Sequence, residues 1–303
     1  MMHAELTQTG VAVLTGTSGI VVSARSAPVI APDEIAVRVE AVGIWGYETA
    51  GRVVHLGSSV TTHRVGDRVA VVPGVPCGAC TPCRTAHPSL CSDVEHPAMR
   101  AADGTLHHYI TVPEHAAITL PDAVPTERGA LLAPLALAVA ACRTAAVSRD
   151  SHVLITGAGA VGLLVLQVAR AFGASRVTVT DLDPHRLRLA ADLGADGILE
   201  AAALATDVAI DPDVHIDCTG DARAVRDGIS WLAPRGTSVM LGVGADRTLE
   251  LPFSWVLEKE LVITGVSRTG ECFPLALELL VSGAVQLDRI SCTTLSMPSA
   301  ANH

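Results

Sequence analysis

Four cysteines lie close together in the sequence and could bind one metal ion. Cys77, Cys80, Cys83 and Cys91 follow the spacing C-x2-C-x2-C-x7-C within one segment that has no periodic pattern. Four thiolates from so short a loop can surround a tetrahedral Zn²⁺ without an open position, which predicts a structural metal site. An iron–sulfur cluster and two disulfides are the alternatives. The ferredoxin run, however, continues with C-x3-C-P, and disulfides are rare in a cytoplasmic protein.

A glycine-rich motif marks a candidate site for a dinucleotide. Gly157, Gly159 and Gly162 spell G-x-G-x-x-G between a predicted strand at 152–156 and a predicted helix, which is the context that this motif requires. The first glycine permits a tight turn, the second lets the backbone approach a pyrophosphate, and the third lets the helix pack closely. We place Val161 with them among the cofactor-binding residues. A glycine-rich turn without a ligand is the alternative.

An acidic residue follows the glycine motif at the distance typical of NAD sites. Asp181 ends the next predicted strand, about 20 residues beyond Gly162. A carboxylate there can accept hydrogen bonds from both adenosine ribose hydroxyls and would repel a 2′-phosphate, which favours NAD over NADP. Arg186 could lie along the adenine edge or could be a solvated residue of the following helix.

The composition limits the class of protein that carries these sites. The chain has 303 residues, of which 49% are hydrophobic and 17% are charged, and its formal net charge is −10. This length suggests about two domains, and the acidic balance argues against binding to nucleic acid or to anionic membranes. The longest uncharged apolar stretch, between Arg128 and Arg143, is too short to span a bilayer. The uncharged residues 9–24 lack the preceding basic residues of a signal peptide, so we expect a cytoplasmic protein.

The two halves of the sequence have different patterns. Apolar and polar residues alternate at 34–43, and further short strands with glycine-containing turns make the first half β-rich. Beyond residues 148–151, strands alternate with helices, which indicates a parallel sheet covered on both faces. The sequence therefore predicts an α/β protein in which a β-rich domain precedes a doubly wound domain.

These motifs together resemble the zinc-containing medium-chain alcohol dehydrogenases, most closely the polyol branch of sorbitol, iditol and xylitol dehydrogenases. The run GDRVAVVPGVPCGACTPCRTAHPSLC looks like the structural-zinc lobe of that family, and DGTLHHYITVPEHAAITLPDAV looks like the segment after it. The run GAGAVGLLVLQVARAFGASRVTVTDLDPHRLRLAADLGAD is similar to the cofactor fold. The shorter runs DCTG, PRGTSVMLGVG and ELVITGVSR also match, so the resemblance covers nearly the whole chain.

The resemblance implies the following domains and chemistry. A GroES-like catalytic domain would occupy residues 1–147 with its zinc lobe at 77–91, a Rossmann NAD-binding domain 148–280, and a return to the first domain, ending early, 281–303. Such enzymes oxidise a secondary alcohol or polyol to a ketone and pass hydride to NAD, with a catalytic zinc ion as Lewis acid. The resemblance also implies that Arg268 lies near cofactor and substrate, and that the protein is a homodimer or homotetramer.

The sequence departs from this family at the catalytic zinc site. Residues 43–44 (Gly-Ile) are followed directly by residues 45–48 (Trp-Gly-Tyr-Glu), so the segment with the family's ligand Cys and its proton-relay residues has no counterpart. Tyr47 stands where the family has its ligand His, and Ala133 stands where a Glu precedes Pro-Leu. Only Glu48 is retained, and one carboxylate does not hold a catalytic zinc ion. We expect that this catalytic site is lost.

Three functional hypotheses follow. The first is an NAD-dependent oxidoreductase of the polyol dehydrogenase type with one structural zinc ion and impaired activity. The second is a zinc-independent reductase in which Tyr47 donates the proton and Glu48 orients it, because a phenol can act as a general acid. The third is a catalytically silent NAD-binding protein. His55 and His63 lie near the altered segment, and we expect both to be surface residues of a strand or turn.

Overall fold

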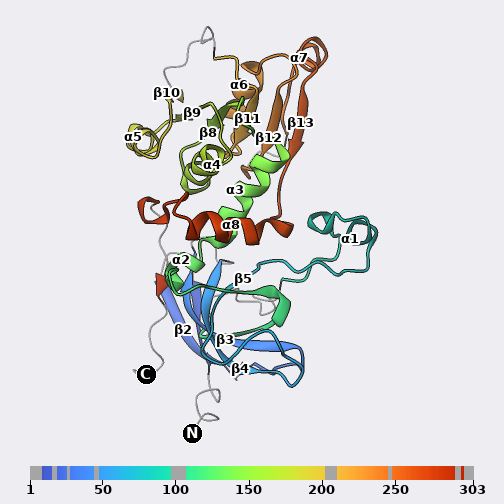
Figure 1. The fold of residues 1–303 in the computed structure, drawn as a ribbon, viewed down its shortest axis with the longest axis vertical. Coiled ribbons are helices and arrows are strands. Elements are labelled where there is room, and N and C mark those ends of the chain that lie inside the picture. The colour runs from blue at the N-terminus through green and yellow to red at the C-terminus, as the bar shows by residue number, and fades with distance from the viewer. Residues whose placement is uncertain are drawn as a thin grey trace. The chain divides into compact units, whose positions relative to one another are not determined.

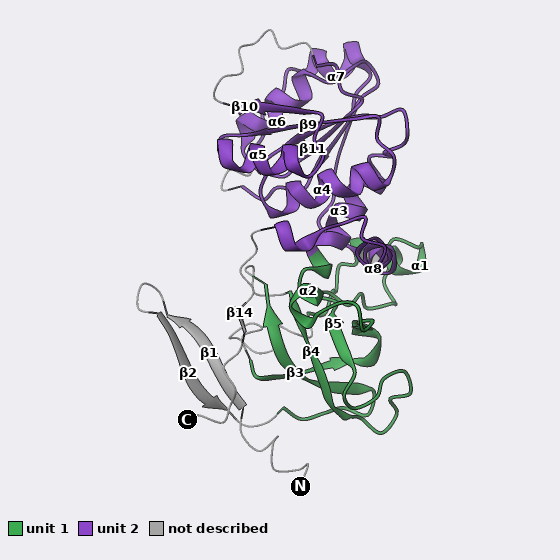
Figure 2. Cartoon of the chain, turned by 60° about the vertical axis from the view of Figure 1, so that its left-hand side comes forward, with its two compact units in different colours: residues 1–133, 292–303 green, residues 134–291 purple. Residues whose placement is uncertain are grey.

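The structure is a computed structural model, and it describes residues 9–15, 19–25, 28–43, 48–96, 107–201, 210–244, 248–290 and 295–296. The chain forms two compact units (Figure 2): unit 1 is residues 1–133 with 292–303, and unit 2 is residues 134–291. The functional domain boundaries expected near residues 148 and 281 remain predictions. No helix in the described part of the chain has both the length and the apolar character needed to cross a bilayer.

Unit 1 is built on an antiparallel sheet in which the strand order is β14-β3-β4-β5-β7, with β6 also paired to β3. Its strands are β3 (Glu34–Val42), β4 (Thr49–Leu56), β5 (Arg68–Val71), β6 (Tyr109–Pro113), β7 (Ala117–Thr119) and β14 (Leu295–Ser296). Alternate residues of β3, Ile35 and Val37 among them, pack with Val53 and Val69 of the next strands in one apolar core. A separate antiparallel hairpin is formed by β1 (Thr9–Thr15) and β2 (Gly19–Arg25).

Short helical segments connect and follow these strands. They are α1 (Thr81–Arg84), α2 (Thr126–Gly129) and the 3-10 turns η2 (Pro88–Leu90) and η4 (Glu114–Ala116). The longer helix α3 (Leu132–Thr144) is rich in Ala and Leu and is mostly buried.

Unit 2 is a six-stranded, fully parallel sheet with the order β10-β9-β8-β11-β12-β13 (Figure 1). Its strands are β8 (His152–Thr156), β9 (Arg176–Asp181), β10 (Gly197–Glu200), β11 (Val214–Asp217), β12 (Thr237–Met240) and β13 (Val262–Gly265). Its helices after α3 are α4 (Ala160–Ala171), α5 (Pro184–Asp192), α6 (Ala222–Ser230), α7 (Phe253–Lys259) and α8 (Phe273–Val281), with the 3-10 turns η6 (Gly270–Cys272) and η7 (Leu287–Arg289).

This strand order confirms the doubly wound sheet. Counted along the chain from β8, the order in the sheet is 3-2-1-4-5-6, which is the dinucleotide-binding topology. The inner strands β8 and β11 are buried along almost their whole length, as expected for parallel strands that are covered on both faces. The order reverses between β8 and β11, and ligands of such sheets bind at the carboxyl ends of the strands at that point.

Candidate functional site: a dinucleotide turn and a four-cysteine loop

The predicted glycine turn lies at the carboxyl end of β8, and its three glycines have three different surroundings. Gly157 has φ +93°, a left-handed conformation that favours glycine. Gly159 is the N-cap of α4, and a Cβ atom there would meet no atom within 4 Å. A Cβ atom on Gly162 would collide with the carbonyl oxygen of Gly157. The third glycine therefore allows the helix to pack on the turn, whereas the second leaves its backbone open to a ligand.

The start of α4 has the properties of a phosphate site. No side chain caps the first amides of the helix, so these N–H groups can bind an anion, and the helix dipole favours negative charge there. Val161 lies in the first turn of this helix. The open face at Gly159 and the uncapped amides fit the pyrophosphate of a dinucleotide.

Asp181 lies directly beside the turn, at the end of the neighbouring strand β9. Its Oδ2 accepts a hydrogen bond from the N–H of Ala158 at 2.6 Å, and its Oδ1 accepts one from the N–H of Asp183 at 2.8 Å. The N–H of Gly157 donates to the carbonyl oxygen of Thr180, 2.7 Å away. The structure thus joins the glycine turn and the acidic residue by direct bonds, and the carboxylate oxygens retain lone pairs for further donors.

The two arginines predicted for this site both follow the carboxyl end of a strand, Arg186 after β9 and Arg268 after β13. Arg186, on α5, is exposed and its Nε is 3.7 Å from Oδ2 of Asp183. Arg268 is also exposed and follows β13, which is three strands from β8 in the sheet order. Hydrogen bonds thus join the glycine turn to Asp181, while the roles of Arg186 and Arg268 at the cofactor site stay predictions.

A buried polar group at the end of β11 was missed by sequence reasoning. Asp217, next to Thr156 in the register of β11 and β8, is fully buried and accepts hydrogen bonds from Thr156, Thr219 and Gly220. His215, two residues earlier on the same strand, is fully buried as well. The available signal was the pair of ionisable residues within the short strand VHID, where a buried parallel strand is normally apolar.

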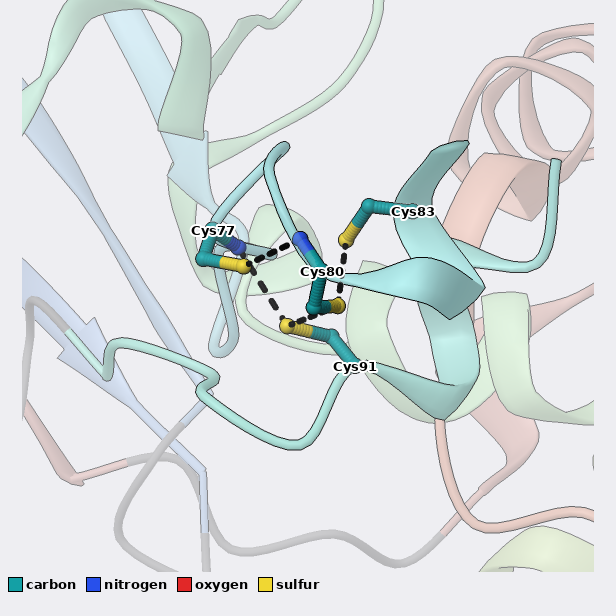
Figure 3. A group of neighbouring side chains, drawn as sticks. All are labelled: Cys77, Cys80, Cys83 and Cys91. Atoms are coloured by element: carbon teal, nitrogen blue, oxygen red, sulfur yellow. Dashed lines mark hydrogen bonds between the residues drawn. The ribbon is translucent and has the colours of Figure 1, made fainter. Parts of the chain in front are cut away.

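The four cysteines of the predicted metal site meet in unit 1 (Figure 3). Their sulfur atoms all lie within 4.8 Å of one another, and none forms a disulfide. The sulfur of Cys80 is 3.4 Å from that of Cys83 and 3.7 Å from that of Cys91. Four thiolates around one tetrahedral zinc ion lie about 3.8 Å apart, given a Zn–S bond of about 2.3 Å. The donor set and its spacing therefore fit one zinc ion.

The local backbone explains why these sulfurs converge. Gly78 has φ +70° and turns the chain between the first two cysteines, and Cys80 is the N-cap of α1. Backbone amides also point at the sulfurs: the N–H of Cys77 donates to Sγ of Cys91 at 3.3 Å. The N–H of Cys83 lowers the pKa of Cys80 to about 6, while burial raises the pKa of Cys83 to about 12. Amide donors of this kind orient the ligands of a metal site.

The residues near the altered segment of unit 1 are only partly described. Glu48, the residue before β4, is buried against Gly43, whose N–H donates to the carbonyl oxygen of Glu48 at 2.8 Å. Tyr47 lies outside the described residues. Ala133 is buried. Within the described ranges, the four cysteines are the only group of three or more His, Cys, Asp and Glu side chains placed to hold a metal ion.

His63 differs from the sequence expectation. It is buried rather than on the surface. Its Nε2 lies 2.9 Å from the carbonyl oxygen of Glu114, and its Nδ1 lies 3.2 Å from Oγ1 of Thr119. The ring therefore joins the loop after β4 to β7 and its preceding turn, which is a structural role.

Comparisons with known proteins agree with both units. Residues 20–122 match the alcohol dehydrogenase GroES-like domain, and residues 160–282 match the zinc-binding dehydrogenase family. A protein of Aspergillus terreus, named as a probable D-xylulose reductase A, is 38% identical over 259 residues, or 82% of this chain and 73% of the relative. A solved structure from Sinorhizobium meliloti, assigned to the zinc-binding dehydrogenases and bound to NADP, is 28% identical with a TM-score of 0.86, covering 93% of this chain and 91% of the other.

A longer alignment shows that the two proteins differ in length within the matched region. Sorbitol dehydrogenase of Bombyx mori is 32% identical over 317 aligned positions, covering 94% of this chain and 91% of the relative. Since 94% of 303 residues is about 285, about 30 aligned positions of the relative have no counterpart inside this chain. These similarities, the GroES-like match and the doubly wound sheet confirm the predicted fold class. The chain belongs to the zinc-containing alcohol dehydrogenase family of oxidoreductases and is similar to its polyol dehydrogenases.

Proposed function

We propose that this chain binds NAD(H) at the carboxyl ends of β8 and β9 and acts as an oxidoreductase on a small alcohol or polyol. The observation that supports this most directly is the open backbone at Gly159 beside Asp181. When bound, NAD accepts the hydride that leaves the carbinol carbon. The chain's own residues would bind the pyrophosphate at the start of α4 and the ribose hydroxyls at the carboxylate of Asp181.

NAD rather than NADP is the expected cofactor. Asp181 would place a negative charge where NADP has its 2′-phosphate, and repulsion between the two disfavours that cofactor. A related solved structure is bound to NADP, so the choice depends on the residues of this chain rather than on the fold. Arg186 and Arg268 belong to the proposed cofactor site as residues that would reach it from the same edge of the sheet.

The zinc content is a second part of the proposal. Cys77, Cys80, Cys83 and Cys91 would hold one structural ion, which would stabilise a loop that has little apolar core of its own. The second, catalytic zinc ion is proposed to be missing. This is supported by the residues at two positions that the resemblance assigns to zinc ligands, Tyr47 and Ala133.

Loss of the catalytic metal would impair alcohol oxidation. A Lewis acid at the substrate oxygen supplies several kcal/mol of transition-state stabilisation, and each ~1.4 kcal/mol is a factor of ten in rate. A catalytically silent NAD-binding protein is therefore the second candidate. The reductase in which Tyr47 donates a proton is the third, and its support is the buried carboxylate of Glu48 next to Tyr47 in the sequence.

A homodimer or homotetramer is also proposed. Strand β13 lies at the edge of the sheet, and Val262 on it is 53% exposed. Phe253 and Leu257 of the preceding helix α7 are 73% and 62% exposed. Pairing of this edge with a second copy would cover apolar side chains that otherwise face water. A cytoplasmic location belongs to the same proposal, because a reducing compartment keeps four such thiols available for zinc.

Two assays on purified protein test these proposals. NADH fluorescence titration should give saturable binding with a dissociation constant in the micromolar range, and absence of binding would contradict the proposed function. Turnover of a panel of polyols and their ketones then separates the candidates. Slow oxidation supports an impaired dehydrogenase, no turnover with intact NADH binding supports the silent protein, and an ordinary enzymatic rate would contradict the loss of the catalytic site.

A further inference from the structure

Asp217 is a buried carboxylate whose hydrogen-bond donors all come from uncharged groups. Its Oδ1 accepts from Oγ1 of Thr156 at 2.9 Å, and from the N–H and Oγ1 of Thr219 at 3.1 and 2.6 Å. Its Oδ2 accepts from the N–H of Gly220 at 2.9 Å. Burial of a carboxylate is costly unless its oxygens are satisfied, so these four donors account for its place in the interior. Two of the donors are backbone amides of the loop that follows β11.

The hydroxyl of Thr156 links Asp217 to a buried histidine. Because this hydroxyl donates to Asp217, it must accept from Nε2 of His215, which lies 3.1 Å away. Nδ1 of His215 then accepts from Oγ of Ser238 at 3.0 Å. Burial lowers the pKa of His215 to about 4, so the ring is neutral at physiological pH. Ser238, the neutral ring of His215 and Thr156 thus each donate one hydrogen bond. These three bonds join β12, β11 and β8.

The loop held by Asp217 lies between two other backbone segments without space for side chains. Cγ2 of Thr219 is 2.8 Å from the position that a Cβ atom on Gly157 would occupy. On the other side, Gly220 has φ +68°, and a Cβ atom on it would collide with the backbone of residues 242–244. The position of residues 218–220 therefore sets the distance between the glycine turn after β8 and the backbone after β12.

We infer that Asp217 is a positioning residue for the cofactor. It acts through Thr219 and Gly220, because its own oxygens are enclosed and already bonded to protein donors. Asp217 fixes the loop after β11 against the turn at Gly157. This loop and this turn flank the point where the strand order reverses, which is where the dinucleotide is proposed to bind. This inference rests on the proposed NAD site and goes beyond it, since it assigns a role to a side chain beneath that site.

A carboxylate is required here for a specific reason. Both of its oxygens face N–H groups of the loop, and an amide side chain has only one acceptor oxygen. In Asp217→Asn, the amide nitrogen must face either the N–H of Gly220 or the donors of Thr219, and one side of the loop is released. The substitution preserves volume and shape, so it tests the hydrogen bonds rather than the packing.

The experiment measures NADH affinity and the thermal midpoint of the cofactor-free protein for each variant. Asp213→Asn is the matched control, because Asp213 precedes β11 at the opposite edge of the sheet and its Oδ2 accepts from the N–H of His152 at 2.8 Å. We expect Asp217→Asn to weaken NADH binding at least tenfold at a temperature where it is folded. Asp213→Asn should stay within twofold of wild type.

A second pair of variants keeps the inference testable if Asp217→Asn does not fold. Thr219 is exposed, so Thr219→Val should fold. It removes the hydroxyl that donates to Asp217 and accepts from the N–H of Asp221 within the same loop, and it should weaken NADH binding severalfold. Thr219→Ser retains the hydroxyl and should restore most of the affinity. NADH binding by Asp217→Asn or Thr219→Val that equals wild type would overturn the inference while leaving the proposed function intact. A wild-type protein that binds no NADH would overturn the proposed function as well.

Discussion

Replacement of Gly159 by alanine should separate cofactor binding from folding. Gly159 has φ −70° and ψ −176°, which alanine adopts readily, and a Cβ atom there meets no protein atom within 4 Å. Alanine restricts the unfolded chain more than glycine does, which stabilises the folded protein by about 0.4–1 kcal/mol. Alanine is also a poorer N-cap than glycine, which destabilises the helix by a similar amount. We therefore expect the free energy of unfolding to change by less than about 1 kcal/mol.

The same methyl group would stand where the pyrophosphate is proposed to approach the backbone. Gly159→Ala should weaken NADH binding at least tenfold, which corresponds to about 1.4 kcal/mol. The assay is a fluorescence titration with NADH, combined with a urea or thermal unfolding curve of the cofactor-free protein. Unchanged NADH affinity in a folded Gly159→Ala protein would refute the assignment of the open backbone to the cofactor.

Gly162→Ala is the matched comparison, because it should reduce the stability of the fold, whereas Gly159→Ala should reduce NADH affinity. Its Cβ atom would collide with the carbonyl oxygen of Gly157, so the start of α4 must move away from the turn. Overpacking of this kind costs about 1–3 kcal/mol, so Gly162→Ala should unfold at clearly lower temperature than Gly159→Ala. Equal stability of the two variants would contradict the close packing of helix and turn.

Three further predictions concern other parts of the chain. The hydroxyl of Thr62 and the amides of Thr61 and Thr62 lower the pKa of Glu114 from 4.5 to about 2. Its stabilising contribution is therefore complete above pH ~4.5 and is lost as the pH falls towards 2, and thermal midpoints between pH 7 and 3 should fall more steeply for wild type than for Glu114→Gln. Asp181→Ser should weaken NADH binding about tenfold and should reduce the ratio of NADH affinity to NADPH affinity, measured by parallel titrations with the two cofactors. Cys91→Ser should abolish zinc binding and lower the thermal midpoint, measured by metal analysis and unfolding, while NADH affinity at low temperature stays near that of wild type.

The features that sequence reasoning found are those set by local spacing. Four cysteines within 15 positions stay close together in space because the chain between them is short. A glycine motif between a strand and a helix has one well-known geometry. Both could be predicted because the residues that make each feature are neighbours in the chain. The alternation of strands and helices likewise determined the doubly wound sheet.

The features that sequence reasoning missed depend on contacts between distant residues. The bond between Thr156 and Asp217 joins residues 61 positions apart, and each residue alone is an ordinary polar group at the end of a strand. His63 was expected at the surface because a histidine in a turn is usually solvated. Its burial depends on Glu114 and Thr119, more than 50 residues away. Tertiary packing, not local pattern, decides such positions.

Zinc stoichiometry of the purified protein tests the central claim most directly. The claim is a dehydrogenase fold that retains its NAD site and its four-cysteine zinc site but has lost the catalytic zinc ion. Metal analysis by mass spectrometry, normalised to protein concentration, should give one zinc ion per chain. Two zinc ions per chain would contradict the loss of the catalytic site.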